Sequence, residues 1–168
     1  MNKNTLLLLL FCIGTGSSAE TLELPMFTIE IPDGWTHSIT EPASTQNGSA
    51  QLTARTSLAS SSLVSVTSTS GRGDLRIHAL AVPVGMEAVD EVSLRRLTNL
   101  DSRIDLEWQS WGNGSGYQFS YIENNSFHMQ WWITNGQTIL LASYSSDSGP
   151  SDSVIGEVDA MLDSINLL

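Results

Sequence analysis

Residues 126–145 read SFHMQWWITNGQTILLASYS and carry the strongest local signal of structure in the chain. Apolar and polar side chains alternate on both sides of Asn135-Gly136, which predicts two β-strands at 126–134 and 137–145. A type I′ turn needs positive φ at both central residues, and Asn-Gly tolerates that conformation best. The stretch therefore predicts an antiparallel hairpin with Asn135 and Gly136 at its tip.

This turn also predicts which side chains face each other. The pairs expected across the hairpin are Trp131 with Leu140, Trp132 with Ile139, and His128 with Ser143. A second two-residue turn at Asn124-Asn125 adds the pairs Tyr117 with Trp132 and Tyr121 with His128. One face of the sheet then carries Phe127, Met129, Trp131 and Ile133, and the other carries Tyr117, Trp132, Ile139 and Leu141. Both faces are apolar, so we expect both to be covered.

The same alternation continues along the rest of the chain. It predicts further strands at about 26–31, 50–56, 62–69, 73–82, 104–111 and 116–123. Two stretches instead show helical spacing of apolar residues, 86–100 and 151–166, and are expected to be amphipathic helices that lie on the sheet. Residues 20–168 are predicted to form one α+β domain with a central antiparallel β-sheet flanked by helices.

Residues 1–19 resemble a secretory signal peptide. Lys3 precedes the apolar run Leu6–Ile13, and Ser17-Ser-Ala19 presents small side chains for cleavage before Glu20. The apolar run is much shorter than the roughly 20 residues that span a bilayer, so no stable membrane insertion is expected. Cleavage would remove the only cysteine, Cys12. We expect a periplasmic protein, with an extracellular location as the alternative.

The charge of the chain limits its partners. There are 18 acidic side chains against 7 basic ones, a net charge of −11. Such a field repels nucleic acid and anionic membrane surfaces and favours basic proteins or cations. The alternative is that the negative charge only keeps an exported protein soluble and has no role in binding.

Three features near the ends of the domain resemble the PsbP-like family. They are the extended segment Phe27–Trp35, the strand Thr138–Tyr144 followed by an acidic turn, and a terminal helix that ends in Leu162-Asp-Ser-Ile-Asn-Leu-Leu168. The resemblance implies an α/β/α sandwich around an antiparallel sheet. Members look mostly like binding or assembly modules, and the family offers no catalytic set to carry over. Periplasmic immunity proteins of type VI secretion systems are similar in size and export signal, which is analogy rather than a sign of function.

Catalytic and cofactor chemistry has little support in the sequence. No Gly-x-Ser-x-Gly motif is present, and His37, His78 and His128 are too scattered to suggest a metal site. Acids gather at Asp101, Asp105 and Glu107, and at Asp147 and Asp152. The first group leaves open a carboxylate-dependent hydrolase, and the second leaves open a weak calcium loop. We expect no enzyme activity, no cofactor and no bound metal.

Aromatic residues next to acids suggest a protein-binding edge. We expect partner contacts from Trp111, Tyr117, Trp132, Asp105 and Glu107, because tryptophan and tyrosine often carry the binding energy of interfaces. The glycine-rich stretch Gly112–Gly116 is expected to be a flexible hairpin tip beside them. The alternative is that the two helices cover both faces of the sheet and bury the tryptophans.

The expected function is a non-enzymatic protein-binding module, most specifically an immunity or inhibitor protein that occludes a secreted toxin or cell-wall hydrolase. An envelope or photosynthetic assembly factor of the same fold is the second hypothesis. A carboxylate-dependent hydrolase is the third.

Overall fold

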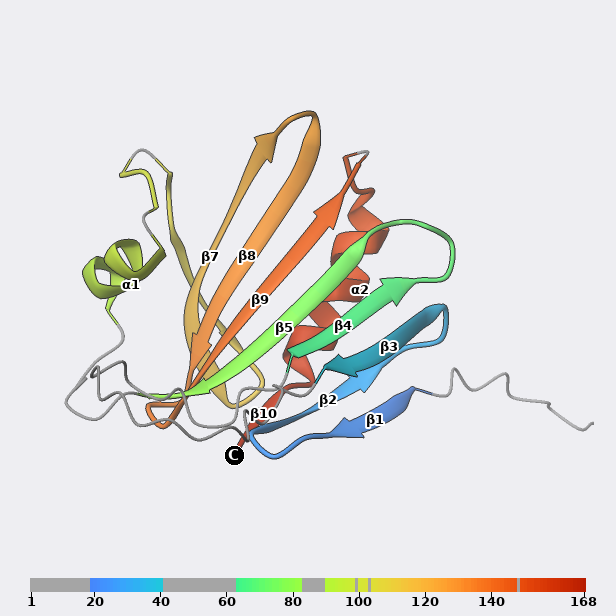
Figure 1. The fold of residues 1–168 in the computed structure, drawn as a ribbon, viewed down its shortest axis with the longest axis horizontal. Helices are drawn as coiled ribbons and strands as arrows, with labels where there is room; N and C mark the ends of the chain where they lie inside the picture. Colours follow the sequence, from blue (N-terminus) through green and yellow to red (C-terminus); the bar gives the residue numbers. More distant parts are fainter. Residues whose placement is uncertain (1–18, 41–62, 83–89, 99, 103, 148) are drawn as a thin grey trace, which may run out of the picture.

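The computed structural model describes residues 19–40, 63–82, 90–98, 100–102, 104–147 and 149–168, which form ten strands and two helices (Figure 1). The large sheet has seven antiparallel strands in the order β3-β4-β5-β9-β8-β7-β6, and a small sheet has the order β1-β2-β10. The strands are β1 (Glu20–Glu23), β2 (Phe27–Ile31), β3 (Trp35–Thr40), β4 (Leu63–Ser68), β5 (Asp74–Ala81), β6 (Glu107–Trp111), β7 (Gly114–Glu123), β8 (Ser126–Thr134), β9 (Thr138–Ser146) and β10 (Asn166–Leu167). The helices are α1 (Glu91–Thr98) and α2 (Asp152–Asp163).

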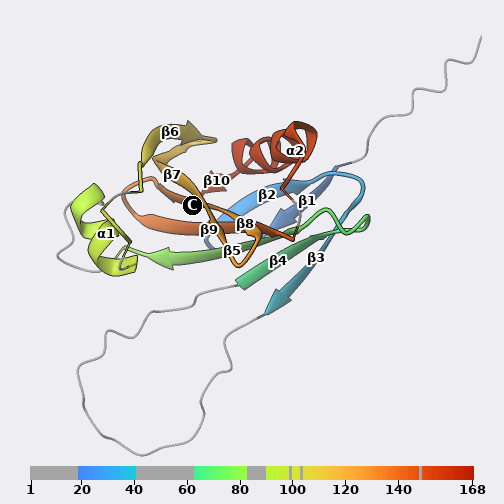
Figure 2. The same cartoon turned by 90° about the horizontal axis from the view of Figure 1, so that it is seen from above.

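The main core lies between one face of the large sheet, α2 and the small sheet. Figure 2 shows α2 on one side of the sheet. Its buried stripe of Val154, Val158, Met161 and Leu162 belongs to the same apolar cluster as Trp131 of β8 and Tyr144 of β9. Burial of large side chains of this kind stabilises a domain by about 1.5–3 kcal/mol each, so this layer holds α2 in place.

A smaller core covers part of the other face. Phe119 and Trp132 are buried there, and the apolar residues packed against them are Leu100, Ile104, Leu106, Tyr117, Tyr121 and Leu141. Arg95 of α1 binds Glu91 and donates to the backbone carbonyls of Asp101 and Ile104 at 3.0 and 2.9 Å. Arg95 therefore fixes the segment that supplies this cover.

The fold class is as predicted: an α+β fold with a central antiparallel sheet and helices beside it. Six of the predicted strands correspond to β2, β4, β5, β7, β8 and β9, and β6 is shorter than predicted because 104–106 is not a strand. The predicted strand at 50–56 and residues 1–18 of the predicted leader at 1–19 lie outside the described residues. None of the helices in the described ranges is long and apolar enough to cross a bilayer.

The two predicted hairpin registers have different outcomes. Asn124 and Asn125 both have positive φ, 50° and 66°, and β7 pairs with β8 as predicted. The register of β8 with β9 is wrong by two residues, because Trp131 faces Ala142 and Trp132 faces Leu141. Of Asn135 and Gly136, only Gly136 has positive φ, at 90°.

Asn135 causes that difference by acting through its side chain. Its Oδ1 accepts hydrogen bonds from the backbone N–H groups of Gln137 and Thr138 at 3.0 and 2.9 Å, so Asn135 begins the turn instead of occupying its centre. Gly136 and Gln137 are the central residues. A shift of two residues keeps every side chain on its predicted face, since the side-chain period of a strand is two.

Candidate functional site

The predicted acidic edge is partly formed. Asp105 and Glu107 are exposed and line a shallow hollow of about 370 Å³ beside Gln118. Gln118 donates to the Glu107 carboxylate at 2.8 Å. Tyr117 is half-buried and makes an edge-to-face contact with Trp108, with ring centroids 4.7 Å apart. Three of the five predicted residues therefore lie near one another at the β6 side of the sheet.

The expectation that Trp111 and Trp132 belong to an exposed edge is wrong. Their side chains are 3% and 2% exposed and pack in the two cores. Trp111 ends β6 against the main core, whereas Trp132 lies under Leu100, Ile104 and Leu106. Neither ring is available to a partner, so the alternative of core packing holds for both.

The glycine-rich hairpin tip is fixed to the chain end. Gly112 has φ of +53°, and a Cβ at this position would clash with the backbone carbonyl of Ile165. Asn113 exchanges two hydrogen bonds with the backbone of Leu167. The expectation of a free, flexible binding tip is therefore wrong, because Gly112 packs against Ile165 and Asn113 is hydrogen-bonded to Leu167.

Trp108 is the exposed aromatic residue of the edge. Its side chain is 56% exposed, and Glu107, Gln109 and Ser110 of the same strand are exposed as well. Trp108 and Trp111 are three residues apart in one strand, so they point to opposite faces of the sheet. That spacing does not say which of the two rings is buried.

A second polar surface lies on the face of the large sheet opposite α2. Matched register places one residue from each of β4, β5, β9 and β8 in three successive rows. The rows are Leu63, His78, Leu141 and Trp132; Ser65, Arg76, Ser143 and Gln130; and Thr67, Asp74, Ser145 and His128. We call these three rows the open face. The sequence analysis placed His128 opposite Tyr121 but did not mention Arg76, because the rows join strands that are far apart in the chain.

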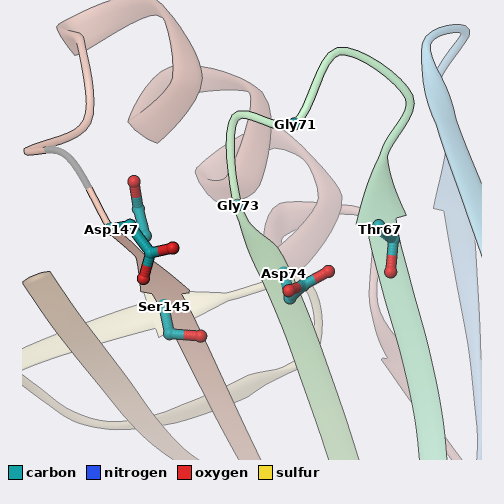
Figure 3. A pocket seen from close by; sticks show the side chains of 7 residues that line it. Thr67, Gly71, Gly73, Asp74, Ser145 and Asp147 are labelled. Atoms are coloured by element: carbon teal, nitrogen blue, oxygen red, sulfur yellow. The ribbon is translucent and has the colours of Figure 1, made fainter. Parts of the chain in front are cut away.

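Three hollows follow one another along the open face. One of about 320 Å³ and one of about 210 Å³ share Arg76, Gln130 and Ser143. A third, of about 200 Å³, includes Thr67, Asp74 and Ser145 and ends at Asp147. Figure 3 shows Asp74 on β5, Ser145 on β9 and Asp147 just beyond β9 at this end of the sheet. The open face is thus cationic in its middle and acidic at one end.

The acidic side chains of the third hollow are Asp74 and Asp147. Within the described ranges, histidine, cysteine, aspartate and glutamate side chains nowhere gather in a group of three that could hold an ion. Asp147 accepts a hydrogen bond of 3.3 Å from the Ser126 hydroxyl. The hollow also owes its shape to Gly73, where a Cβ would clash with the buried Tyr144 ring.

The strongest polar cluster, formed by Arg72, Glu157 and Trp35, is structural. Arg72 binds the Glu157 carboxylate through two nitrogens at 2.8 and 3.0 Å, and the Trp35 indole donates to it at 2.7 Å. The Arg72 hydrogen bonds hold the pKa of Glu157 below its usual value, burial opposes this, and the Trp35 hydrogen bond lowers the pKa further. The cluster ties α2 to β3 and to the turn before β5.

Comparison with known proteins identifies the fold as PsbP-like. Cyanobacterial PsbP (CyanoP) from Synechocystis sp. PCC 6803 superposes with a TM-score of 0.53 at 13% identity, covering 94% of this chain and 97% of that one. A crystal structure from Bacteroides thetaiotaomicron VPI-5482 superposes with a TM-score of 0.50 at 15% identity, covering 85% of this chain. This chain spans only 45% of the Bacteroides protein. No family model and no curated protein matches the sequence.

Proposed function

We propose that this protein is an exported, non-enzymatic protein-binding module that receives an extended segment of its partner along β6. The observation that carries the proposal is the exposure of four consecutive side chains, Glu107–Ser110, on a strand at the end of the sheet. Among the described strands, β6 has a neighbour on one side only. An edge strand of this kind offers backbone N–H and C=O groups to a second chain.

The side chains of the edge indicate the chemistry of the partner. Trp108 supplies apolar area with few rotatable bonds, as interface hot spots do. Asp105 and Glu107 precede it in the chain and are exposed, and the whole chain carries a net charge of −11. These features favour a basic partner, because opposite fields speed association and orient the encounter. A basic rim around the active site of a secreted toxin or hydrolase meets this description, which supports an immunity or inhibitor role.

The test compares two exposed apolar residues on the two edges of the same sheet. Wild type, Trp108→Ala and the control Ile39→Ala on β3, where Ile39 is 43% exposed, serve as baits in periplasmic extracts. We expect a defined partner that binds wild type and the Ile39 variant but binds the Trp108 variant at least about 30-fold more weakly, as for a lost hot spot. Equal binding to all three baits would show that β6 is not the interface.

Proline substitutions test strand pairing directly. Consecutive N–H groups point to opposite sides of a strand, so of Gln109→Pro and Ser110→Pro one removes a donor used within the sheet and the other removes a donor at the free edge. The variant whose thermal unfolding matches that of wild type lacks the donor at the free edge and should no longer bind the partner. Retained binding by that variant would exclude backbone pairing at β6.

The effect on the partner's activity distinguishes an immunity role from an assembly role. An inhibitor abolishes the activity of its purified partner at equimolar amounts, whereas an assembly factor leaves that partner active and changes the yield of a larger complex. The proposed export predicts a purified periplasmic protein that begins at Glu20, which intact-mass measurement checks.

A further inference from the structure

Arg76 is a cation without a counter-ion on the open face. Three arginines have side chains that the structure describes, and Arg72 and Arg95 each bind a carboxylate, Glu157 and Glu91. Arg76 is exposed, and no carboxylate among the described residues lies within ion-pair distance of it. In a chain with 18 acidic side chains, an arginine of the interior strand β5 that has no carboxylate partner among the described residues can bind an external anion.

The neighbours of Arg76 form a recess around it. Ser143 on β9 lies between Arg76 on β5 and Gln130 on β8. Its side chain is shorter than those of its two neighbours, which leaves space between them. This row lines both the 320 Å³ and the 210 Å³ hollows. The hydroxyl, the amide and the guanidinium are all hydrogen-bond donors that face one space.

Two histidines flank this row and add further donors, and His128 is held in position. His78 lines the larger hollow and His128 the smaller one. Tyr121 stacks on His128 with ring centroids 5.0 Å apart and an interplanar angle of 17°, and its hydroxyl accepts a hydrogen bond of 3.2 Å from Gln130. Because Tyr121 holds both His128 and Gln130, this part of the recess is ordered before any ligand binds.

The recess has an apolar end and an acidic end. Leu63, Leu141 and Trp132 line the larger hollow on one side of Arg76. Asp74 and Asp147 line the third hollow on the other side. Asp74 repels an anionic group at Arg76 from the acidic end. An apolar body attached to that group is therefore expected to lie towards Leu63 and Leu141, where its contact with water is reduced.

We infer that the open face binds a small amphipathic molecule through one carboxylate or phosphate group, with Arg76 as the anchor. The planar guanidinium matches the oxygens of either group by two parallel hydrogen bonds. The larger hollow, of about 320 Å³, lies at the lower end of the volumes of small-molecule sites, roughly 300–1,000 Å³. This site lies on the face of the large sheet opposite the main core and does not involve Glu107–Ser110. The inference therefore does not depend on the proposed β6 interface.

The test is an amide NMR titration of the full domain with three probes: inorganic phosphate, acetate and hexanoate, at constant ionic strength set with chloride. We expect saturable shifts at residues 76, 78, 130 and 143, with hexanoate binding more tightly than acetate because its chain covers Leu63 and Leu141. Phosphate against acetate distinguishes the two oxyanion classes. Absence of saturable shifts at these amides with all three probes would overturn the inference.

Charge variants separate a built site from general attraction. Arg76→Gln should weaken binding at least about tenfold, the effect of losing a charge-assisted hydrogen bond, and Arg76→Lys should restore part of it. Asp74→Asn should strengthen binding, whereas Glu30→Gln, the same charge change on β2 of the small sheet, should leave it unchanged. The amide spectrum itself shows that each variant is folded. Unchanged binding in folded Arg76→Gln, or equal gains from Asp74→Asn and Glu30→Gln, would overturn the inference.

Discussion

Asn113 and the backbone of Leu167 hold each other by two reciprocal hydrogen bonds. The Asn113 amide donates to the Leu167 carbonyl at 2.8 Å, and the Leu167 N–H donates to Asn113 Oδ1 at 2.7 Å. Asn113 stands in the turn between β6 and β7, and Leu167 ends β10. One side chain therefore replaces a strand partner for β10 and joins the large sheet to the C-terminal segment.

Removing this side chain should loosen the chain end. Asn113→Ala leaves the Leu167 N–H without its partner, while the carbonyl keeps a longer bond of 3.3 Å from Asn135, so we expect a loss of about 1–2 kcal/mol in the free energy of unfolding. Urea unfolding measures it. Asn166→Ala, at an exposed position in the same strand, serves as the control and should change stability by less than about 0.5 kcal/mol. Equal effects of the two substitutions would show that the Asn113–Leu167 hydrogen bonds do not contribute to stability.

The Glu157–Arg72 pair should make stability fall in acid. Its hydrogen bonds from Arg72 keep the pKa of Glu157 lower in the folded state than in the unfolded chain, so the stabilisation is fully present above the unfolded pKa. It is lost as pH falls through the folded pKa. The stability gap between wild type and Glu157→Gln should therefore be largest near neutral pH and close in acid, as urea unfolding at several pH values shows. In an Arg72→Gln background the gap near neutral pH should shrink, and an unchanged gap at that pH would contradict the pair.

The strands that the sequence predicts are those whose sides differ. β2, β5 and, from Leu140 on, β9 alternate between buried and exposed or half-buried side chains, so period-two reasoning finds them. β3 escapes it, since only Trp35 is buried and the five residues after it are polar or exposed. β10 has two residues, and its place depends on Asn113 and Met26, which lie far away in the chain.

Site residues are harder to predict because exposure is a tertiary property. The sequence marks Trp108 and Trp111 as flanking one hairpin tip, but the packing of α2 and β10 against that tip decides which ring is buried. Arg76, Ser143 and Gln130 become neighbours only through the pairing of β5, β9 and β8. The β5–β9 pairing was not predictable from turn chemistry, since the two strands are not joined by a short turn.

Asp159 on α2 should destabilise the fold at neutral pH. Burial raises the pKa of Asp159, and Asp163 one turn later raises it further. The folded state therefore holds the proton more tightly than the unfolded chain, and ionisation costs stability above the folded pKa. Asp159→Asn should raise the free energy of unfolding at pH 7 by about 0.3–1 kcal/mol, with no gain in strong acid where both forms are neutral.

The opposite end of the same helix provides the control for Asp159. Asp152 lies in the first turn of α2, where a negative charge is favourable to the helix dipole. Asp152→Asn removes the same charge and should lower stability by a few tenths of a kcal/mol to about 1 kcal/mol. Thermal unfolding of both variants at pH 7 compares them. A gain from both substitutions would point to net charge, and not to position, as the cause.

The two tryptophans of β6 should differ in what their loss costs. Trp111 is 3% exposed in the main core, so Trp111→Ala should reduce the free energy of unfolding by about 3–5 kcal/mol through the cavity it leaves. Trp108 is 56% exposed and contacts only the edge of Tyr117 among the described rings, so Trp108→Ala should cost about 0.5–1.5 kcal/mol. Urea unfolding ranks the two variants, and near-ultraviolet circular dichroism should change strongly only for Trp111. If Trp111→Ala proved as stable as Trp108→Ala, the ring of Trp111 could not be part of the core, and the binding edge would extend to the end of β6.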